Sequence, residues 1–269
     1  MSSKIALGID IGGTGIKAAP VKLKNGKFQE DRYRIPTPKP ATPDAVATTV
    51  ARCIQHFDPP VGTPIGVAFP GVIQQGIART AANLGDEWIG QDVRALVRER
   101  SGHDVQIMND ADAAGMGEHR YGAAQGRDGV ILMTTLGTGI GSALIADGQL
   151  VANTEFGHTM IDGEIAEYWA AESARSRLDL DWDGWIVNLQ RFYSEMERLL
   201  WPDLIIVGGG VSKSHHMFLP HLNLKAPIIP AELRNGAGIV GAAAWASSAS
   251  KREEKNAKAA NKKAAKKSQ

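Results

Sequence analysis

Three glycine-rich loops, each placed after an apolar run, contain the residue types that bind phosphate. They are DIGGTGIK at 10–17, TTLGTGIGS at 134–142 and the cluster Gly208–Gly210. Glycines let backbone N–H groups approach an anion closely, and Thr hydroxyls and a Lys add further donors. One such loop could equally be an ordinary hairpin turn, but three of them indicate a phosphate site. The first loop matches neither a Walker loop nor a dinucleotide-binding fingerprint.

Acidic side chains follow another apolar run, in MNDADAAG at 108–115. Asn109 and Asp110 end the run, and Asp112 lies just beyond it. Phosphoryl transfer to an alcohol needs a carboxylate within hydrogen-bond reach of the attacking hydroxyl, and a strand end can hold one rigidly. Asn109 or Asp110 could instead cap the following helix, and the two roles are compatible. Asp10, beside the first loop, is suited to a divalent cation or its water shell.

The elements that must position these residues alternate along the chain, which predicts an α/β fold. Apolar β-rich runs predict strands at 4–11, 18–23, 64–73, 104–110, 129–145 and 202–212. Helical spacing predicts helices at 43–57, 91–100, 111–120, 164–177, 184–200 and 237–249, the first with Thr42 as N-cap and Pro43 as its first residue. A strand, a hairpin and a glycine loop occur twice, near 5–23 and 130–145, which indicates two similar sub-domains with a cleft between them.

This order predicts two domains and a tail. We expect a small N-terminal domain over 1–115, completed by a final helix at 237–250, and a larger C-terminal domain over 116–236. The tail, 251–269, holds eight Lys or Arg and two Glu, whereas residues 1–250 hold 22 basic and 27 acidic residues. The tail therefore has a net charge of +6, whereas residues 1–250 have a net charge of −5. Such a tail is typical of a solvated, disordered extension, although it could also bind a polyanion.

Composition excludes several classes of protein. Hydrophobic residues make up 43% of the 269 positions, enough to bury a core. No apolar run approaches the roughly 18 residues of a membrane span, and MSSKIALGID lacks a signal-peptide pattern. The single cysteine, Cys53, excludes an internal disulfide and a Cys-rich zinc site. We therefore expect a cytoplasmic protein that does not act at a membrane.

Together the motifs resemble the ROK (repressor, open reading frame, kinase) family of sugar kinases. The matching segments follow the family's order over nearly the whole chain: DIGGTGIK at 10–17, FPGVI at 69–73, AANL at 81–84, MNDADAAG at 108–115, LGTGIGSALI at 136–145, EFGHTMIDGE at 155–164, IIVGGGVS at 205–212 and NGAGIVGAA at 235–243. The resemblance implies an α/β, two-domain, actin/hexokinase-like (ribonuclease H-like) fold with an interdomain cleft. It also implies an enzyme that phosphorylates the 6-hydroxyl of a hexose.

The resemblance assigns roles residue by residue. Asp110 matches the catalytic base, and Asp10 would lie near a magnesium–phosphate complex and hold Mg²⁺ through water. The sugar-binding positions are matched by Asn83, Asn109, Asp110, Glu155, His158 and Glu167. The phosphate-donor positions are matched by Asp10, Gly12, Gly13, Thr14, Lys17, Thr135, Gly137, Thr138, Gly139, Gly209 and Gly210.

One segment departs from the family pattern. Many members follow the Gly-His dipeptide with a Cys-rich zinc loop, whereas GHTMIDGEIAEYWAAESA at 157–174 contains no cysteine. We therefore predict no structural zinc. His158 and Glu167 lie in this altered segment, so each has an alternative interpretation: a histidine satisfied in the core, and a solvent-facing helix carboxylate.

Within the family, the short chain, the absent zinc cysteines and LGTGIGSALI are similar to the polyphosphate glucokinases and polyphosphate/ATP-dependent glucomannokinases. This implies inorganic polyphosphate or ATP as donor, and glucose or mannose as acceptor. A polyphosphate chain needs basic residues along its path. Arg120, Arg127, Lys213 and Arg234 lie near motif loops, although a solvated surface charge is the better interpretation of each.

Two alternatives stay open. The first is a strictly ATP-dependent ROK hexokinase for mannose, fructose or an N-acetylhexosamine. The second is a non-catalytic sugar-sensing regulator of the same family, which would carry an N-terminal helix-turn-helix domain. The first predicted strand begins at Lys4, which leaves no room for that domain. The family's kinases are commonly dimers, so we expect a homodimer with no specific nucleic-acid partner.

Overall fold

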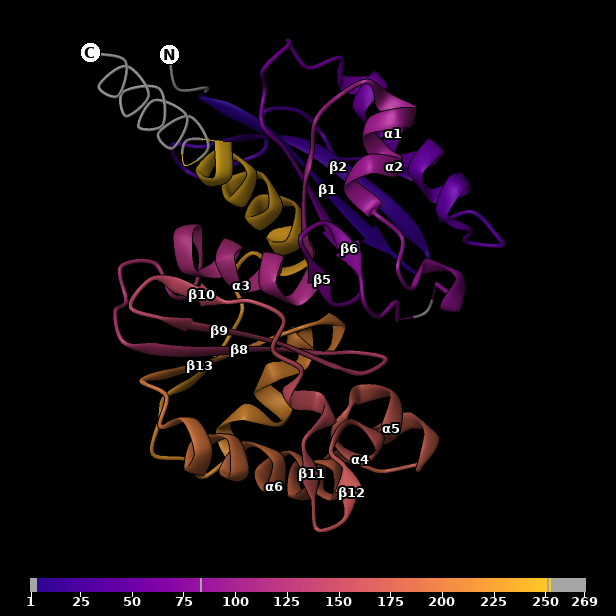
Figure 1. Ribbon diagram of the computed structural model, residues 1–269. Helices are drawn as coiled ribbons and strands as arrows, with labels where there is room; N and C mark the ends of the chain where they lie inside the picture. The colour runs from indigo at the N-terminus through magenta and orange to yellow at the C-terminus, as the bar shows by residue number, and fades with distance from the viewer. Residues whose placement is uncertain (1–3, 83, 251, 253–269) are drawn as a thin grey trace, which may run out of the picture. The chain divides into compact units, whose positions relative to one another are not determined.

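The computed structural model describes residues 4–82, 84–250 and 252, and the chain divides into two compact units (Figure 1). Unit 1 comprises Met1–Met108 and Ala242–Gln269, and unit 2 comprises Asn109–Gly241. The boundary lies before the one expected after residue 115, because α3 (Asp110–Tyr121) packs against β9 (Ile140–Ala146) of unit 2. Residues 253–269 of the expected basic tail lie outside the described residues.

Unit 1 is built on a five-stranded mixed sheet. Its order is β3 (Tyr33–Ile35), β2 (Gly15–Lys22), β1 (Ile5–Gly12), β4 (Ile65–Phe69) and β7 (Gln106–Asn109). The first three strands form an antiparallel meander, and β4 runs parallel to β1. A short hairpin, β5 (Ile73–Gln74) and β6 (Ile77–Ala78), and a 3-10 turn, Asp86–Trp88, complete the unit.

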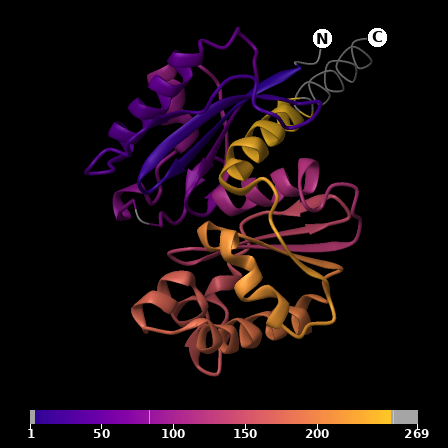
Figure 2. The ribbon, with the colours of Figure 1, turned by 180° about the vertical axis from the view of Figure 1, so that it is seen from behind.

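Helices cover the unit 1 sheet because its strands are apolar on both faces. The helices α1 (Pro43–Phe57) and α2 (Val93–Ser101) share one core with β1, β2 and β4. Residues 242–250, part of the C-terminal helix at 237–250, run beside the same sheet (Figure 2). A Cβ on Gly66 of β4 would lie 1.9 Å from the Ala242 carbonyl oxygen. Only a glycine therefore permits this close approach, and the expectation that the final small-residue helix packs tightly is confirmed.

Local signals at the helix starts are confirmed. Thr42 caps α1, with its hydroxyl 3.3 Å from the Ala45 N–H, and Pro43 is the first helical residue.

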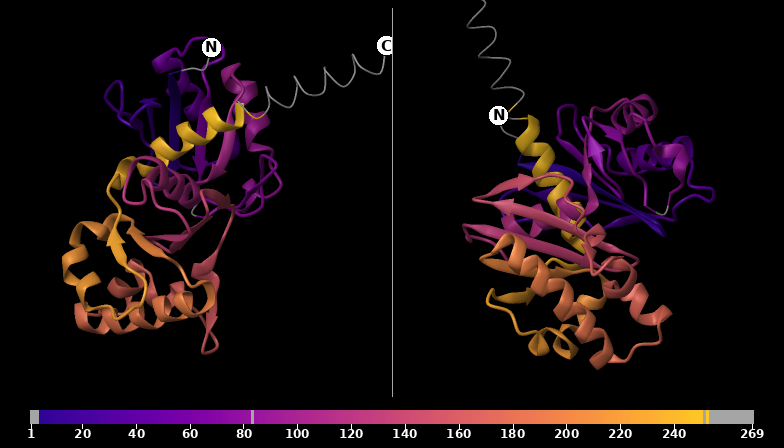
Figure 3. Two further views of the ribbon diagram at one scale, coloured as in Figure 1. Left: turned by 90° about the vertical axis from the view of Figure 1, so that its left-hand side faces the viewer. Right: turned by 60° about the horizontal axis from the view of Figure 1, so that its bottom comes forward.

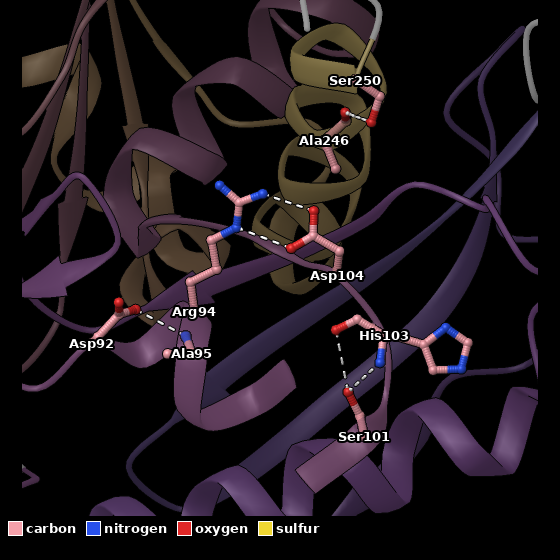
Figure 4. A network of polar contacts seen from close by, with 8 residues as sticks. All are labelled: Asp92, Arg94, Ala95, Ser101, His103, Asp104, Ala246 and Ser250. Carbon is pink, nitrogen blue, oxygen red and sulfur yellow. Dashed lines mark hydrogen bonds and ion pairs between the residues drawn. The ribbon is translucent and has the colours of Figure 1, made fainter. Parts of the chain in front are cut away.

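At the start of α2, Arg94 donates two hydrogen bonds to Asp104, from Nε to Oδ1 at 3.1 Å and from the terminal nitrogen to Oδ2 at 2.7 Å (Figure 4). This exposed pair ties α2 to the segment before β7, the strand that ends at Asn109. It contributes no more than about 1 kcal/mol to stability.

Unit 2 repeats the same sheet order. The strands follow one another as β10 (Gln149–Val151), β9, β8 (Val130–Leu136), β13 (Leu204–Gly208) and β14 (Ile228–Pro230). The strands β10, β9 and β8 are antiparallel, whereas β13 and β14 extend the sheet in parallel from β8. The two units thus share one sheet order, in line with the strand, hairpin and glycine loop that the sequence repeats, although β3, β10 and β14 were not expected.

Two layers of helix enclose the unit 2 sheet (Figure 3). On one face, Leu132 and Ile205 of the sheet pack with α6 (Trp182–Leu200) and with α4 (Glu167–Ala170) and α5 (Glu172–Arg177). On the other face, Ile131 and Ile206 pack with α3. A small hairpin, β11 (Met160–Ile161) and β12 (Glu164–Ile165), and 3-10 turns at Phe156–His158, Gly210–Met217, Leu219–His221 and Arg234–Gly236 complete the unit. No helix among the described residues is long and apolar enough to cross a membrane.

Candidate functional site

The first glycine loop is the tight turn between β1 and β2. Gly12 pairs with Gly15, so Gly13 and Thr14 form the exposed tip of the hairpin. Within the described part of the chain, no hydrogen bond uses the backbone N–H of Gly13 or Thr14. The Gly12 carbonyl oxygen accepts a 2.5 Å hydrogen bond from the Thr37 hydroxyl. The tip therefore presents two free N–H groups, a geometry that favours an anion.

Asp10 and Lys17 face each other on this hairpin. They are paired in register across β1 and β2, with 3.6 Å between the Lys17 Nζ and the Asp10 Oδ2. Burial raises the pKa of Asp10, and Lys17 opposes that rise by its charge and hydrogen bond. The structure thus brings both predicted donor-site residues to the base of the first loop.

The second and third glycine loops meet at the ends of two neighbouring parallel strands, β8 and β13. Thr135 pairs with Gly208, the last residue of β13. The next residue, Gly209, has a φ of 86°, and a Cβ there would lie 2.1 Å from the Leu136 carbonyl oxygen. A side chain at 209 is thus excluded twice, by backbone conformation and by space. At Gly210 a Cβ would meet nothing within 4 Å, so bare backbone faces open space.

Two residues from the helices after β12 anchor the second loop. Ser173 donates from its N–H to the Gly137 carbonyl at 3.0 Å and from its hydroxyl to the Thr138 carbonyl at 2.6 Å. Glu167 accepts from the Ile140 N–H at 3.1 Å. These three hydrogen bonds fix the backbone of the second loop to α4 and α5. Sequence reasoning placed Glu167 in the sugar site but did not find Ser173, because no local pattern marks its contact with a loop 35 residues earlier.

Asn109 and Asp110 occupy the junction of β7 and α3. Asn109 ends the strand and caps the helix, since its Oδ1 accepts from the Asp112 N–H at 3.0 Å. Asp110 is the first helical residue, partly buried, and its Oδ1 accepts from the Ala111 N–H at 2.8 Å. A helix N-terminus favours a negative charge at this place. The dual expectation of a cap and a rigidly held carboxylate is met by this geometry.

Glu155, His158 and Glu167 form one cluster in unit 2. His158 Nε2 lies 3.3 Å from Glu167 Oε1, and the His158 N–H donates to the Glu155 carbonyl at 2.9 Å. Burial raises the pKa of Glu155, while His158 lowers it and Glu167 raises it. The His158 side chain is 57% exposed and that of Glu167 21% exposed. His158 is therefore not a core histidine, and Glu167 is not a free surface carboxylate.

Asp112 is a buried carboxylate beside this cluster. It is 1% exposed, its Oδ2 accepts from the Asn153 N–H at 2.8 Å, and its Oδ1 has no hydrogen-bond partner among the described residues. Burial raises the pKa of Asp112 to about 7, the Asn153 hydrogen bond lowers it, and Glu155 raises it further. Asp112 thus holds the segment that leads to Glu155. The sequence showed its position after Asp110 but not its burial.

Asp112 should make the stability of the protein depend on pH. Its pKa is about 7 in the folded chain and 3.8 in the unfolded one. The folded state therefore keeps a proton that the unfolded state has lost, and the free energy of unfolding falls as pH rises from about 4 to 7, by up to about 4 kcal/mol. Asp112→Asn removes this pH-dependent contribution, so the free energy of unfolding of the variant, relative to that of wild type, should rise between pH 5 and pH 8. Urea unfolding of both proteins at pH 5 and at pH 8 measures this difference.

Asp128→Asn is the matched control for that measurement. Asp128 is exposed in unit 2, so its variant should keep the wild-type slope of stability against pH. An Asp112→Asn slope equal to that of wild type would show that the buried carboxylate stays ionised in the folded protein.

One predicted site residue is not placed: Asn83 lies outside the described residues. Unit 1 carries the first glycine loop with Asp10 and Lys17. Unit 2 carries Asn109, Asp110, the Glu155 cluster and the second and third glycine loops.

Comparison with known proteins identifies the family. A family model described as "ROK family" matches residues 6–176. The polyphosphate glucokinase of Mycobacterium tuberculosis (strain CDC 1551 / Oshkosh) is 46% identical over 237 residues, which cover 88% of this chain and 89% of that protein. The chain belongs to the ROK family. The ROK resemblance inferred from the motifs is confirmed.

Solved structures agree with this assignment. The inorganic polyphosphate/ATP-glucomannokinase of Arthrobacter sp. strain KM matches with a TM-score of 0.86 and 51% identity, covering 91% of this chain and 98% of that one. A ROK family glucokinase from Streptomyces griseus, in complex with glucose and AMPPNP, matches with a TM-score of 0.73 at 23% identity, covering 89% and 98%. The second likeness concerns the fold alone. The expected actin/hexokinase-like α/β fold is confirmed.

Proposed function

We propose that this ROK protein is a glucokinase that transfers a phosphoryl group from inorganic polyphosphate or ATP to the 6-hydroxyl of glucose. The observation that carries the proposal is the 46% identity to a polyphosphate glucokinase over 88% of the chain. The 51% identity to a polyphosphate/ATP-glucomannokinase supports the same donors. The chemistry of the described residues supports the proposal, since the chain offers glycine loops with free N–H groups and a carboxylate, Asp110, held at a helix start.

Asp110 acts on the acceptor in this proposal. The sugar 6-oxygen attacks the terminal phosphorus of the donor, the bond from that phosphorus to the bridging oxygen breaks, and the hydroxyl proton passes to the Asp110 carboxylate. The shortened donor leaves with the bridging oxygen. Asn109, Glu155, His158 and Glu167 bind sugar hydroxyls, because amide, carboxylate and imidazole groups supply both donors and acceptors. Asn83 keeps its predicted role as a sugar ligand.

The glycine loops bind the donor. In unit 1, the N–H groups of Gly13 and Thr14 and the Lys17 ammonium bind phosphate oxygens. In unit 2, the loop with Gly137, Thr138 and Gly139 does the same, and Thr135 adds its hydroxyl. Gly209 and Gly210 leave room for the nucleoside when ATP is used. Fixed N–H dipoles stabilise the charge that develops in the transition state without reorganising.

The residues around Asp10 fit a magnesium ion that arrives with the phosphates. Among the described residues no group of three or more His, Cys, Asp or Glu could hold a metal on its own. Mg²⁺ is usually bound through one or two carboxylates together with waters and substrate phosphates, rather than in a protein cage. Asp10, a single carboxylate beside the free N–H groups of the loop, matches that pattern and would hold the ion through water. When bound, Mg²⁺ neutralises charge on the phosphates.

An initial-rate matrix tests the function. Glucose and mannose are each crossed with long-chain polyphosphate and ATP, with and without Mg²⁺. We expect Mg²⁺-dependent glucose 6-phosphate formation with polyphosphate, turnover with ATP, and slower turnover of mannose. Turnover with ATP alone would reduce the donor assignment to an ATP-dependent hexokinase. Absence of turnover with every pair, in a protein that binds glucose, would favour a sugar-sensing regulator.

The proposed location is the cytoplasm, and the proposed assembly is a homodimer. A hexose kinase without a membrane partner is suited to the cytoplasm, where a reduced Cys53 is expected. Cys53 is buried, and burial raises the pKa of its thiol to about 11. The proposed homodimer can be checked by light scattering of the purified full chain.

A further inference from the structure

A row of three charged residues lies across the strands at the base of the first glycine loop. Lys17 of β2 lies opposite Asp10 of β1 and, on its other side, opposite Arg34 of β3. Residues directly opposite in antiparallel strands point to the same face of a sheet. Arg34 therefore extends the Asp10–Lys17 pair by one strand.

Arg34 lies directly over the loop. Its guanidinium donates a 2.8 Å hydrogen bond to the Thr14 carbonyl. A Cβ on Gly15 would lie 2.6 Å from the Arg34 Nε and 2.8 Å from its Cζ. Gly15 thus leaves the space that the guanidinium occupies. Together with the Thr37 hydroxyl on Gly12, the β3 segment binds two loop carbonyls and leaves the N–H groups of the tip free.

The charge on Arg34 is not compensated. Lys17 has Asp10 at 3.6 Å, whereas in the part of the chain that the structure describes no carboxylate lies within 4.0 Å of the Arg34 guanidinium. Arg34 is exposed, and one of its five N–H groups is occupied by Thr14. A planar guanidinium with spare donors binds a phosphate through two hydrogen bonds, which a lysine ammonium cannot reproduce.

We propose that Arg34 is a donor-binding residue, whose guanidinium binds an oxygen pair on the phosphate chain of the donor at the β1–β2 loop. The proposal rests on the proposed kinase function. The ligand is a phosphoanhydride chain, shared by polyphosphate and by the triphosphate of ATP. Arg34 is not among the basic residues that the sequence suggested for the donor path, Arg120, Arg127, Lys213 and Arg234, and it contacts the loop backbone itself.

Arg34→Gln is the first test, since a glutamine amide can still donate to the Thr14 carbonyl. We expect the KM for polyphosphate to rise about tenfold or more at low ionic strength, with the KM for glucose unchanged. The difference from wild type should shrink as salt is added, because salt screens an exposed charge. Arg34→Lys should recover part of the loss. Lys22→Gln is the matched control, because Lys22 is exposed, has the same charge and pairs with Ile5 at the opposite end of the hairpin.

Gly15→Ala is the second test, because it displaces the guanidinium without removing its charge. If Gly15→Ala and Arg34→Gln both act through the Arg34 guanidinium, the variant that carries both should lose no more donor affinity than the more severe of the two single variants. The same series is measured with ATP and, without glucose, by equilibrium binding of polyphosphate. A donor KM for Arg34→Gln within twofold of the Lys22→Gln value for every donor that wild type uses would overturn the proposal, as would a parallel rise in the KM for glucose. Wild type inactive with polyphosphate but active with ATP would instead refute the proposed donor, and the ATP series would then decide the role of Arg34.

Discussion

Asp110→Asn is expected to lower kcat for glucose phosphorylation by about a hundredfold to ten-thousandfold. The reason is that an amide cannot accept the proton of the attacking hydroxyl. The substitution should leave the local structure intact, because the Asp110 Oδ1 accepts from the Ala111 N–H at 2.8 Å, and an amide oxygen can accept the same bond. Asn109 still caps α3 through the Asp112 N–H. The loss should therefore appear in kcat rather than in folding.

The measurement pairs initial rates with glucose binding. Rates are taken with polyphosphate and with ATP, glucose affinity is taken by calorimetry, and melting shows that the variant is folded. Asp183→Asn is the matched control: it makes the same chemical change in the first turn of α6, where the carboxylate is exposed. We expect the control to keep wild-type kcat. If Asp110→Asn kept near-normal kcat, another group would have to accept the proton, and a loss confined to glucose affinity would make Asp110 a sugar ligand only.

The position of Asp110 could be predicted because every signal for it is local. A β-rich run that ends in Asn-Asp before a small-residue pattern indicates a strand end, a cap and a helix start, and β7 and α3 meet at that point. The sequence signals for the glycine loops are local in the same sense, since each loop directly follows the strand that presents it. The Thr42–Pro43 helix start is a third case.

The position of Arg34 could not be predicted because it depends on the pairing of distant segments. The strand β3 has three residues, and the Pro-rich stretch that begins at Ile35 reads as an irregular loop. Only the register of β3 on β2 brings Arg34 beside Lys17. Asp112 presents the same difficulty, since its hydrogen-bond partner Asn153 is 41 residues away. Sequence spacing located the chemistry of the loops, whereas tertiary pairing decides which further side chains reach them.

Glu118→Ala is expected to reduce the free energy of unfolding by about 3 to 5 kcal/mol and the melting temperature by about 10 °C. Glu118 is 0% exposed and lies in the last turns of α3. Its Oε2 accepts from the N–H groups of Ala123 at 2.8 Å and Glu232 at 3.1 Å, and its Oε1 accepts from that of Leu233 at 2.7 Å. Alanine would leave three partly buried N–H groups without their acceptor, together with a cavity at the fully buried Glu118 position.

A conservative variant at Glu118 and a control at a second glutamate are compared with Glu118→Ala, and calorimetric melting measures the stability of each. Glu118→Gln keeps one carbonyl oxygen, which can still accept from Ala123 and Glu232, but its NH₂ then faces the Leu233 N–H, so an intermediate loss is expected. Glu195→Ala is the control at a carboxylate that solvent reaches: the Glu195 side chain is 25% exposed and pairs with the exposed Arg198 on the same helix, and this loss should cost no more than about 1 kcal/mol. A Glu118→Ala protein as stable as the Glu195→Ala protein would mean that water replaces the carboxylate.

The consequence should reach activity, because α3 carries Asp110 at its first residue and Glu118 near its end. Glu118→Ala should therefore turn over normally at low temperature and lose activity on warming, before the control does. Gly122 provides an internal check, since a Cβ there would lie 2.1 Å from the Glu118 Oε2. Gly122→Ala should be destabilising in wild type and much less so in the Glu118→Ala background, where that oxygen is absent. A smaller cost of Gly122→Ala in the Glu118→Ala background would show that the Glu118 carboxylate occupies the space beside Gly122, and Glu118→Gln, which keeps the volume, then isolates the part of the stability that comes from the hydrogen bonds.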